Sequence, residues 1–109
     1  MTRPNIICLC GSSRFIAEMA VFAWELEKGG AIVLSMHLLP SWYVGVQKDH
    51  QAEAEGIAEQ MDEIHKRKID MADEVFIMNI GGYIGESTKS EIEYSNAHGK
   101  PICYYEARL

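Results

Sequence analysis

Four short apolar runs alternate with longer segments of helical spacing, and this alternation constrains the fold more than any other feature of the chain. The runs are NIICLC (5–10), AIVLSM (31–36), EVFIMNI (74–80) and PICYYE (101–106). Continuous apolar runs of this length are typical of strands buried on both faces. Strands that alternate with helices pair in parallel through right-handed crossovers. The sequence therefore predicts an α/β fold, a three-layer Rossmann-like (flavodoxin-like) sandwich whose parallel sheet has about four strands in the order 2-1-3-4.

Three helices are predicted between these runs. The first begins at Ser12 or Ser13, which are both good N-cap residues, and stops at Gly29-Gly30. Its apolar stripe is formed by Phe15, Met19, Phe22 and Leu26. The second helix covers 51–72 and carries at the same spacing Ile57, Met61, Ile64 and Lys68. The third follows the loop GGYIGEST and ends at Gly99.

Length and composition predict one soluble domain, residues 1–109. The 48% apolar and 24% charged residues are ordinary for a globular protein. A formal net charge of −6 lacks the basic surface that a long nucleic acid requires, so a small-molecule ligand is expected. No apolar run approaches the roughly 18 to 20 residues of a membrane span, and the N-terminus does not resemble a signal peptide. We therefore expect a cytoplasmic protein without a membrane partner.

Three cysteines fit that compartment, because an odd count without framework spacing argues against a disulfide scaffold. Cys8 and Cys10 alternate with Leu9, so both should point to one face of the first strand. A Cys-x-Cys pair without a second ligand pair is a poor metal site. The pair is therefore predicted to be two buried apolar thiols, and no metal or organic cofactor is expected.

The longest irregular segment, HLLPSWYVGVQKDH (37–50), exceeds most connections in a compact domain, which favours a lid or an interface. It carries Trp42 and Tyr43. Two interpretations remain open for these aromatic rings. They fill the core of their own domain or a dimer contact, or they stack on a planar base.

The predicted strand order places a ligand crevice between the first and third strands. Ligands of open parallel sheets bind beyond the carboxyl ends of the strands, where the order reverses. The loops CGSSRF and NIGGYIGEST meet there, and both lead into helix N-termini that suit an anion. Ser12, Ser13 and Arg14 add two hydroxyls and a guanidinium, although the serines could merely cap the helix and Arg14 could be an ordinary surface residue. Dinucleotide and P-loop signatures are missing from the sequence.

The segment GESTKSEIEYSNAHGKP (85–101) brings Glu86, Glu91 and Glu93 close together in sequence. Thr88 and Glu91 match a capping box, which explains Glu91 structurally. In the first helical turn, however, the dipole would lower the pKa of Glu91 and keep it ionised. An ionised carboxylate at the crevice suits attack on a sugar carbon. Glu93, about 200° further around the helix, and Glu86, ahead of it, are predicted to be solvated.

Several of these motifs together resemble a known enzyme group. They are CGSSR after the first strand, Ala72-Asp73 opening the third, a glycine-bearing loop, and EIEYSNAHGKP. In this combination the chain resembles the nucleoside 2-deoxyribosyltransferase superfamily, which includes nucleoside transferases and 2′-deoxynucleoside 5′-phosphate N-hydrolases. The stretch HKRKIDMADEVFIMNIGGYIGESTKSEIEY is most similar to uncharacterised phage and bacterial members. The resemblance covers most of the chain but not 37–50.

The resemblance implies cleavage or transfer of the N-glycosidic bond of a 2′-deoxynucleoside or its 5′-monophosphate. The glutamate nucleophile of the family falls on Glu91. The loop that faces sugar or phosphate falls on Cys10, Gly11, Ser12, Ser13 and Arg14. Family members also form dimers or larger homo-oligomers in which a neighbour completes the pocket. By that analogy Trp42 and Tyr43 are the expected contact.

Two positions depart from the family pattern. His65 stands where the enzymes carry an aspartate that acts on the base, and a histidine can donate a proton near neutral pH. Gly85 stands where they carry serine or aspartate, so Ser87 or Thr88 is expected to supply the hydroxyl. Further substrate-binding candidates are Asp70 and Gly82. Alternatively, His65 is a helix residue without a ligand, and the chain is a non-catalytic module that binds a nucleotide-derived ligand.

Overall fold

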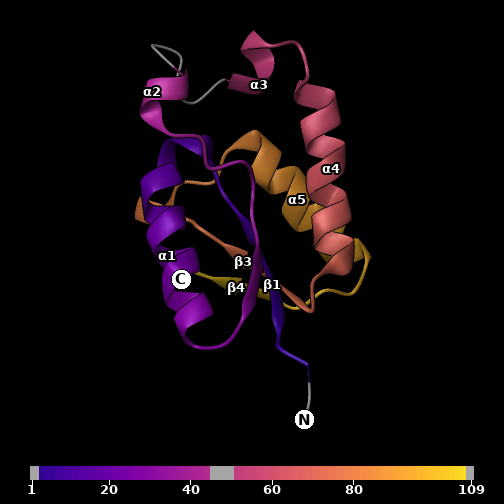
Figure 1. Ribbon diagram of the computed structural model, residues 1–109. Coiled ribbons are helices and arrows are strands. Elements are labelled where there is room, and N and C mark those ends of the chain that lie inside the picture. The colour runs from indigo at the N-terminus through magenta and orange to yellow at the C-terminus, as the bar shows by residue number, and fades with distance from the viewer. Residues whose placement is uncertain (1–2, 45–50, 108–109) are drawn as a thin grey trace.

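The computed structural model describes residues 3–44 and 51–107, and its centre is a parallel four-stranded sheet (Figure 1). The strands are β1 (Ile6–Cys10), β2 (Ile32–Leu34), β3 (Glu74–Ile77) and β4 (Ile102–Tyr104). Their order is β2-β1-β3-β4, and every neighbouring pair is parallel. Helix α1 covers one face of the sheet, and α4 and α5 cover the other (Figure 1). The predicted three-layer α/β class and strand order are therefore confirmed.

Both faces of the sheet are apolar because helices cover both. On β1, Cys8 and Cys10 are fully buried on the α4 and α5 face, as predicted for a Cys-x-Cys strand. The alternate residues Ile7 and Leu9 are buried on the α1 face. In the register of β1 against β3, Cys8 lies opposite Val75. Each strand thus contributes side chains to two separate cores, which explains its unbroken apolar sequence.

Helix α1 (Ile16–Lys28) follows a single 3-10 turn, η1 (Ser13–Phe15). Ser12 caps that turn, because its hydroxyl accepts a hydrogen bond of 3.3 Å from the backbone N–H of Arg14. The predicted start is confirmed, although the first turn is 3-10 rather than α. The helix ends before Gly29, and Gly30 then adopts a φ of 98°, which a side chain would disfavour.

The second predicted helix, 51–72, is two helices in the structure. They are α3 (Gln51–Ala54) and α4 (Ala58–Met71). Gly56 between them has a φ of 74°, which ends the first helical segment. The buried residues of α4 are His65 and Ile69, whereas Ile64 is 39% exposed, so the predicted apolar stripe is rotated from the true one.

The described part of the long connection contains a short helix, α2 (Ser41–Val44). Trp42 is 82% exposed and Tyr43 is 55% exposed. The interpretation that these rings fill the core of their own domain is therefore wrong. Residues 45–50 of the predicted lid lie outside the described residues. Among the described residues, no helix has both the length and the apolar character needed to cross a membrane.

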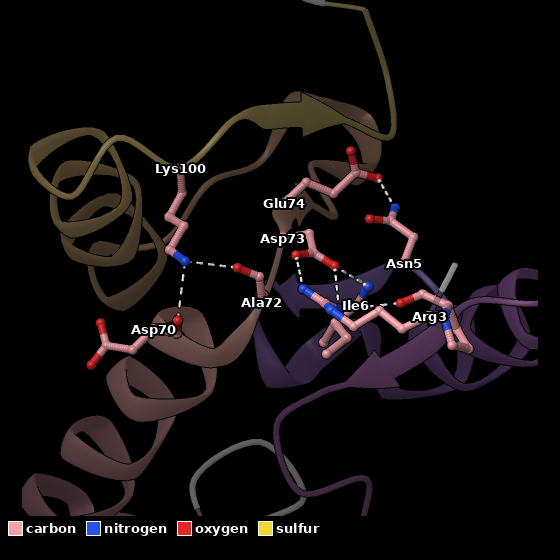
Figure 2. A network of polar contacts seen from close by, with 9 residues as sticks. Arg3, Asn5, Ile6, Asp70, Ala72, Asp73, Glu74 and Lys100 are labelled. Carbon is pink, nitrogen blue, oxygen red and sulfur yellow. Dashed lines mark hydrogen bonds and ion pairs between the residues drawn. The ribbon is translucent and has the colours of Figure 1, made fainter. Parts of the chain in front are cut away.

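At the amino ends of the strands, polar contacts fasten β1, β3 and α4 together, as Figure 2 shows. The Asp73 carboxylate accepts hydrogen bonds of 2.8 Å from the N–H of Ile6 and 2.9 Å from the Arg3 guanidinium. Lys100 Nζ donates to the backbone carbonyls of Ala72 at 2.7 Å and Asp70 at 3.0 Å, where α4 ends. The Ala72-Asp73 pair and Lys100 therefore hold the fold at the sheet edge opposite the predicted crevice.

Candidate active site

A cavity of about 300 Å³ lies beyond the carboxyl ends of β1 and β3, where the strand order predicts a ligand crevice. Its walls come from the loop after β1, the loop before α5 (Glu86–Ala97), and the α4 helix. Nine predicted site residues line it: Gly11, Ser12, Ser13, Arg14, His65, Gly85, Ser87, Thr88 and Glu91. The topology thus brings the two predicted loops to one cavity.

Glu91 and His65 meet at the floor of the cavity. Glu91 Oε1 lies 3.9 Å from His65 Nε2, and their side chains are 13% and 7% exposed. Glu91 belongs to α5 and His65 to α4, and the two helices pack on the same face of the sheet (Figure 1). His65 is therefore a buried residue in contact with Glu91, whereas the alternative that it binds no ligand stays a prediction.

The predicted capping role of Glu91 is not observed. Helix α5 begins at Glu86 with Gly85 as its N-cap, so Glu91 lies in the second turn and Thr88, in the first turn, is buried. Burial raises the pKa of Glu91 to about 7, against the opposing effect of His65. The prediction of a lowered pKa is wrong, because loss of solvation outweighs the helix dipole at this depth. Near neutral pH, both the protonated and the ionised form of Glu91 are therefore populated.

The pKa of His65 is subject to opposing effects. Burial alone lowers its pKa, but the neighbouring Cys8 and Glu91 outweigh burial, and the pKa is raised overall. Its Nδ1 is buried and finds no hydrogen-bond partner among the described residues. Such an unpaired buried group costs about 1–3 kcal/mol. A buried polar atom without a protein partner calls for a specific explanation, such as strain, a catalytic role or an ordered water or ion.

Two thiols lie close to Nε2 of His65. The Sγ atoms of Cys8 and Cys10 lie 3.7 Å and 3.2 Å from His65 Nε2. A hydrogen bond to Cys8, together with burial, raises the pKa of Cys10. Conversely, the hydrogen bond from Cys10 lowers the pKa of Cys8 to about 5, with further help from His65. The predicted burial of both thiols is confirmed, and the fold adds one further potential ligand atom, from His65, that the sequence spacing did not reveal.

Arg14 stands at the mouth of the cavity and is held by Tyr83. The guanidinium carbon lies 3.8 Å from the centre of the Tyr83 ring, and Nη2 donates to the Tyr83 hydroxyl at 3.2 Å. A cation over an aromatic face is attracted by the ring quadrupole. Arg14 is thus an exposed residue, but it is positioned at the cavity. The sequence reading did not identify Tyr83, because one tyrosine in a glycine-bearing loop has no diagnostic spacing.

Some predicted site residues do not line the cavity. Asp70 lies near the end of α4, where it accepts a 2.6 Å hydrogen bond from Tyr94 and pairs with Arg67. Gly82 ends the 3-10 turn η2 (Ile80–Gly82) with a φ of 80°. Cys10 is fully buried beside His65 and lies outside the cavity lining. Of these three, only Cys10 contacts the catalytic candidates.

The other two glutamates lie at the surface. The Glu86 side chain is 92% exposed and pairs with Lys89 at 3.2 Å, although Glu86 opens α5 rather than preceding it and also borders the cavity. Glu93 is exposed on the same helix, as predicted. Of the three glutamates, Glu91 alone is largely removed from solvent.

The sequence reading also missed charged residues that line the cavity from α4. Asp62 and Lys68 lie three residues before and after His65, so all three share one side of the helix. Lys68 Nζ donates to the carbonyl of Ser35 at 2.5 Å. The i, i+3 spacing of Asp62, His65 and Lys68 could have identified this polar side of the helix. It was overlooked because Lys68 had been assigned to the apolar stripe of the same helix.

Comparisons of the chain with protein-family models, with curated proteins and with solved structures found no match.

Proposed function

We propose that this protein cleaves or transfers the N-glycosidic bond of a 2′-deoxynucleoside or its 5′-monophosphate, with Glu91 as the nucleophile. One observation carries the proposal: a buried carboxylate and a buried imidazole lie 3.9 Å apart at the floor of a cavity that has a cation at its mouth. The resemblance of the Glu91 helix motif to the deoxyribosyltransferases supports the same assignment.

The cavity suits a ligand of this class. Its volume of about 300 Å³ is at the lower end of small-molecule sites in proteins. At the mouth, Arg14, Ser12 and Ser13 provide a guanidinium and two hydroxyls, and the α5 N-terminus faces the same space. Such donors favour an anionic group, such as a 5′-phosphate. The sugar would then lie nearer the floor, within reach of Glu91.

The proposed reaction proceeds through a covalent intermediate. The ionised Glu91 attacks C1′ of the deoxyribose, the bond from C1′ to the base nitrogen breaks, and the base leaves with that electron pair and takes up a proton. Water or an acceptor nucleobase then attacks C1′ and gives up a proton to His65, and the C1′–Glu91 ester bond breaks to release the Glu91 carboxylate. Two displacements at one carbon retain its configuration, as in retaining glycosidases.

His65 has a supporting role in this scheme. Its 3.9 Å separation from Glu91 is shorter than the roughly 5 Å between paired carboxyl groups that hold a sugar between them. We therefore place His65 beside the nucleophile, where its positive form stabilises the Glu91 carboxylate. Ester formation removes that negative charge and makes the His65 proton easier to release. The departing base takes this proton directly or through a water molecule.

The experiment is a panel of deoxynucleosides and their 5′-monophosphates, incubated with chelator-treated protein and followed by release of free base. We expect release with at least one substrate, loss of release in Glu91→Gln, and retention in Glu93→Gln. The Glu93 variant makes the same chemical change at an exposed position of α5. No release with any substrate, or equal release by Glu91→Gln, would contradict the proposal.

A second candidate is a non-catalytic module that binds a nucleotide-derived ligand, which is favoured by His65 at the position of the family aspartate. Thermal unfolding with the same panel separates the two functions, because a ligand that binds only the folded state raises the melting temperature. Stabilisation without base release supports the module. Stabilisation with release that depends on Glu91 supports the enzyme.

A further inference from the structure

Two sulfurs and one imidazole nitrogen converge beneath the cavity floor. The Sγ atoms of Cys8 and Cys10 and a ring nitrogen of His65 all lie within 4.8 Å of one another. Both cysteines are 0% exposed and His65 is 6% exposed. The cysteines come from alternate positions of β1 and therefore share a face, while His65 reaches them from α4. This cluster unites the sheet with one of its covering helices.

We propose that Cys8, Cys10 and His65 bind a soft divalent ion of the zinc class, with Glu91 as the fourth ligand. A tetrahedral zinc site with Zn–S near 2.3 Å and Zn–N near 2.0 Å separates each sulfur from the nitrogen by roughly 3.6 Å. The corresponding distances here are 3.7 Å for Cys8 and 3.2 Å for Cys10. The three groups therefore already stand near the corners of such a site.

Glu91 is the candidate for the fourth ligand, although its carboxylate lies outside the group of three atoms that are all within 4.8 Å of one another. Its Oε1 lies 3.9 Å from His65 Nε2, against roughly 3.4 Å between oxygen and nitrogen ligands of a tetrahedral zinc ion. To complete the tetrahedron, the Glu91 carboxylate would move toward the two sulfurs as well as toward the imidazole. Glu91 and His65 both line the cavity, whereas the sulfurs lie behind them. An ion would therefore enter through the cavity and pass these two side chains first.

The donor set selects the class of ion. Thiolate and imidazole ligands favour zinc and similar borderline or soft ions, while magnesium and calcium require oxygen ligands. The third cysteine, Cys103, is exposed on β4 and takes no part in the cluster. It provides an internal control for binding to surface thiols.

The ion would occupy the atoms that the proposed reaction uses, so the metal-bound protein would not cleave substrate. The metal site does not depend on that reaction, because spectroscopy can detect binding without any turnover. Failure of one proposal is therefore distinguishable from failure of the other.

The test is a titration of the reduced, chelator-treated full chain with Co²⁺, followed by displacement with Zn²⁺. We expect saturation at one equivalent, with a thiolate-to-cobalt charge-transfer band and the intense visible bands of tetrahedral cobalt. Cys103→Ser should leave the spectrum unchanged. Cys8→Ser, Cys10→Ser and His65→Gln should each weaken binding at least about 100-fold, because changes in the supporting shell alone cost 10–100-fold.

The Glu91→Gln variant tests the fourth ligand separately, because its visible bands should shift while the charge-transfer band persists. An unchanged spectrum would remove Glu91 from the site. The absence of a charge-transfer band in the wild type, or its loss in Cys103→Ser, would overturn the proposal. If the variants at buried positions fail to fold, the charge-transfer band in the wild type and in Cys103→Ser still shows whether buried thiolates bind the ion. Zn²⁺ should raise the melting temperature of both proteins equally, and no rise in either would also overturn the proposal.

Discussion

The Glu91 carboxylate lies 3.9 Å from Nε2 of His65 in a space where both side chains are almost entirely withdrawn from water. Burial makes the ionised form of each group costly, and their mutual attraction offsets part of that cost. The protein therefore holds a buried acid–base pair at the end of its sheet where ligands of parallel α/β folds bind.

The rate of base release by the chelator-treated protein should rise with pH through about 7. The proposed nucleophile is the carboxylate, and the pKa of Glu91 is raised to about 7 by burial. Between about pH 6 and about pH 8 the ionised fraction increases about tenfold. The measurement is kcat/KM across this range with the best substrate of the panel. A profile that is flat over these two pH units would contradict ionisation of Glu91 as the controlling step.

Glu91→Gln should become more stable than the wild type as the pH rises. The folded-state pKa of Glu91 lies above its unfolded value, so the folded protein binds this proton more tightly. The wild type therefore loses stability between about pH 4.5 and about pH 7, and Gln cannot. The gain of the variant should grow over this range by on the order of 1–3 kcal/mol in urea unfolding. Glu93→Gln should show no comparable growth, and a constant difference for Glu91→Gln would oppose the assignment.

Arg14→Met should weaken the binding of a 5′-monophosphate but leave that of the unphosphorylated nucleoside nearly unchanged. The guanidinium is held at the cavity mouth by Tyr83, where it can bind an anionic group. We expect KM for the monophosphate to rise about tenfold, because a charge-assisted hydrogen bond contributes about 1.5–3 kcal/mol. Arg67→Met is the control, because Arg67 is an exposed arginine that does not line the cavity. Equal effects on both substrates would show that Arg14 does not contact the phosphate.

Gly11→Ala should destabilise the protein by about 1–3 kcal/mol, the usual cost of overpacking a core. A Cβ at Gly11 would lie 3.0 Å from Cβ of Met78 and 3.3 Å from Sδ of Met19, so these neighbours or the loop would have to move by a few tenths of an ångström. Gly29→Ala is the matched control, because its Cβ would meet the Leu26 carbonyl oxygen at an ordinary 3.4 Å. Urea unfolding should place Gly29→Ala within about 0.5 kcal/mol of the wild type. Similar losses in both variants would argue against close packing at Gly11.

Asp73→Asn should destabilise the protein at neutral pH, and this effect should shrink in acid. Hydrogen bonds from Arg3 and from the N–H of Ile6 hold the pKa of Asp73 below its usual value. A lowered folded-state pKa gives stability that is present above the unfolded pKa, near 4, and is lost as the pH falls through the folded value. Unfolding free energies at neutral and acid pH test this. Equal stability of Asp73→Asn and the wild type at neutral pH would exclude the proposed contribution.

Much of the fold could be predicted because its signals are local. Apolar runs identified the four strands, their alternation with helices predicted parallel pairing, and the predicted order 2-1-3-4 is the one observed. The helix boundaries were less predictable. Gly56 divides 51–72 into two helices, and α5 begins at Gly85 and Glu86 rather than at Thr88. At Gly56 a φ of 74° supplies a backbone conformation that side-chain periodicity does not reveal, whereas Gly85 is ordinary extended backbone and carries no such signal.

Two of the motifs behind the family resemblance, Ala72-Asp73 and the Gly-Lys-Pro segment, stabilise the fold and do not line the cavity. Asp73 joins β3 to the start of β1, and Lys100 binds the carbonyl groups at the end of α4. A sequence motif combines residues that stabilise the fold with residues that contact a ligand, and spacing alone does not separate the two. Only the positions of these side chains at the opposite edge of the sheet identify their role.

By itself, the sequence determined the strands, their two buried faces and the pair of loops that meet where the strand order reverses. These properties follow from local periodicity and from general rules of parallel sheets. The surroundings of Glu91 were decided only by the tertiary structure. Its protonation and its access to two thiols and an imidazole depend on how β1, α4 and α5 pack together. Loss of solvation and close contact are properties of neighbouring atoms, and the packing of distant segments determines which atoms become neighbours.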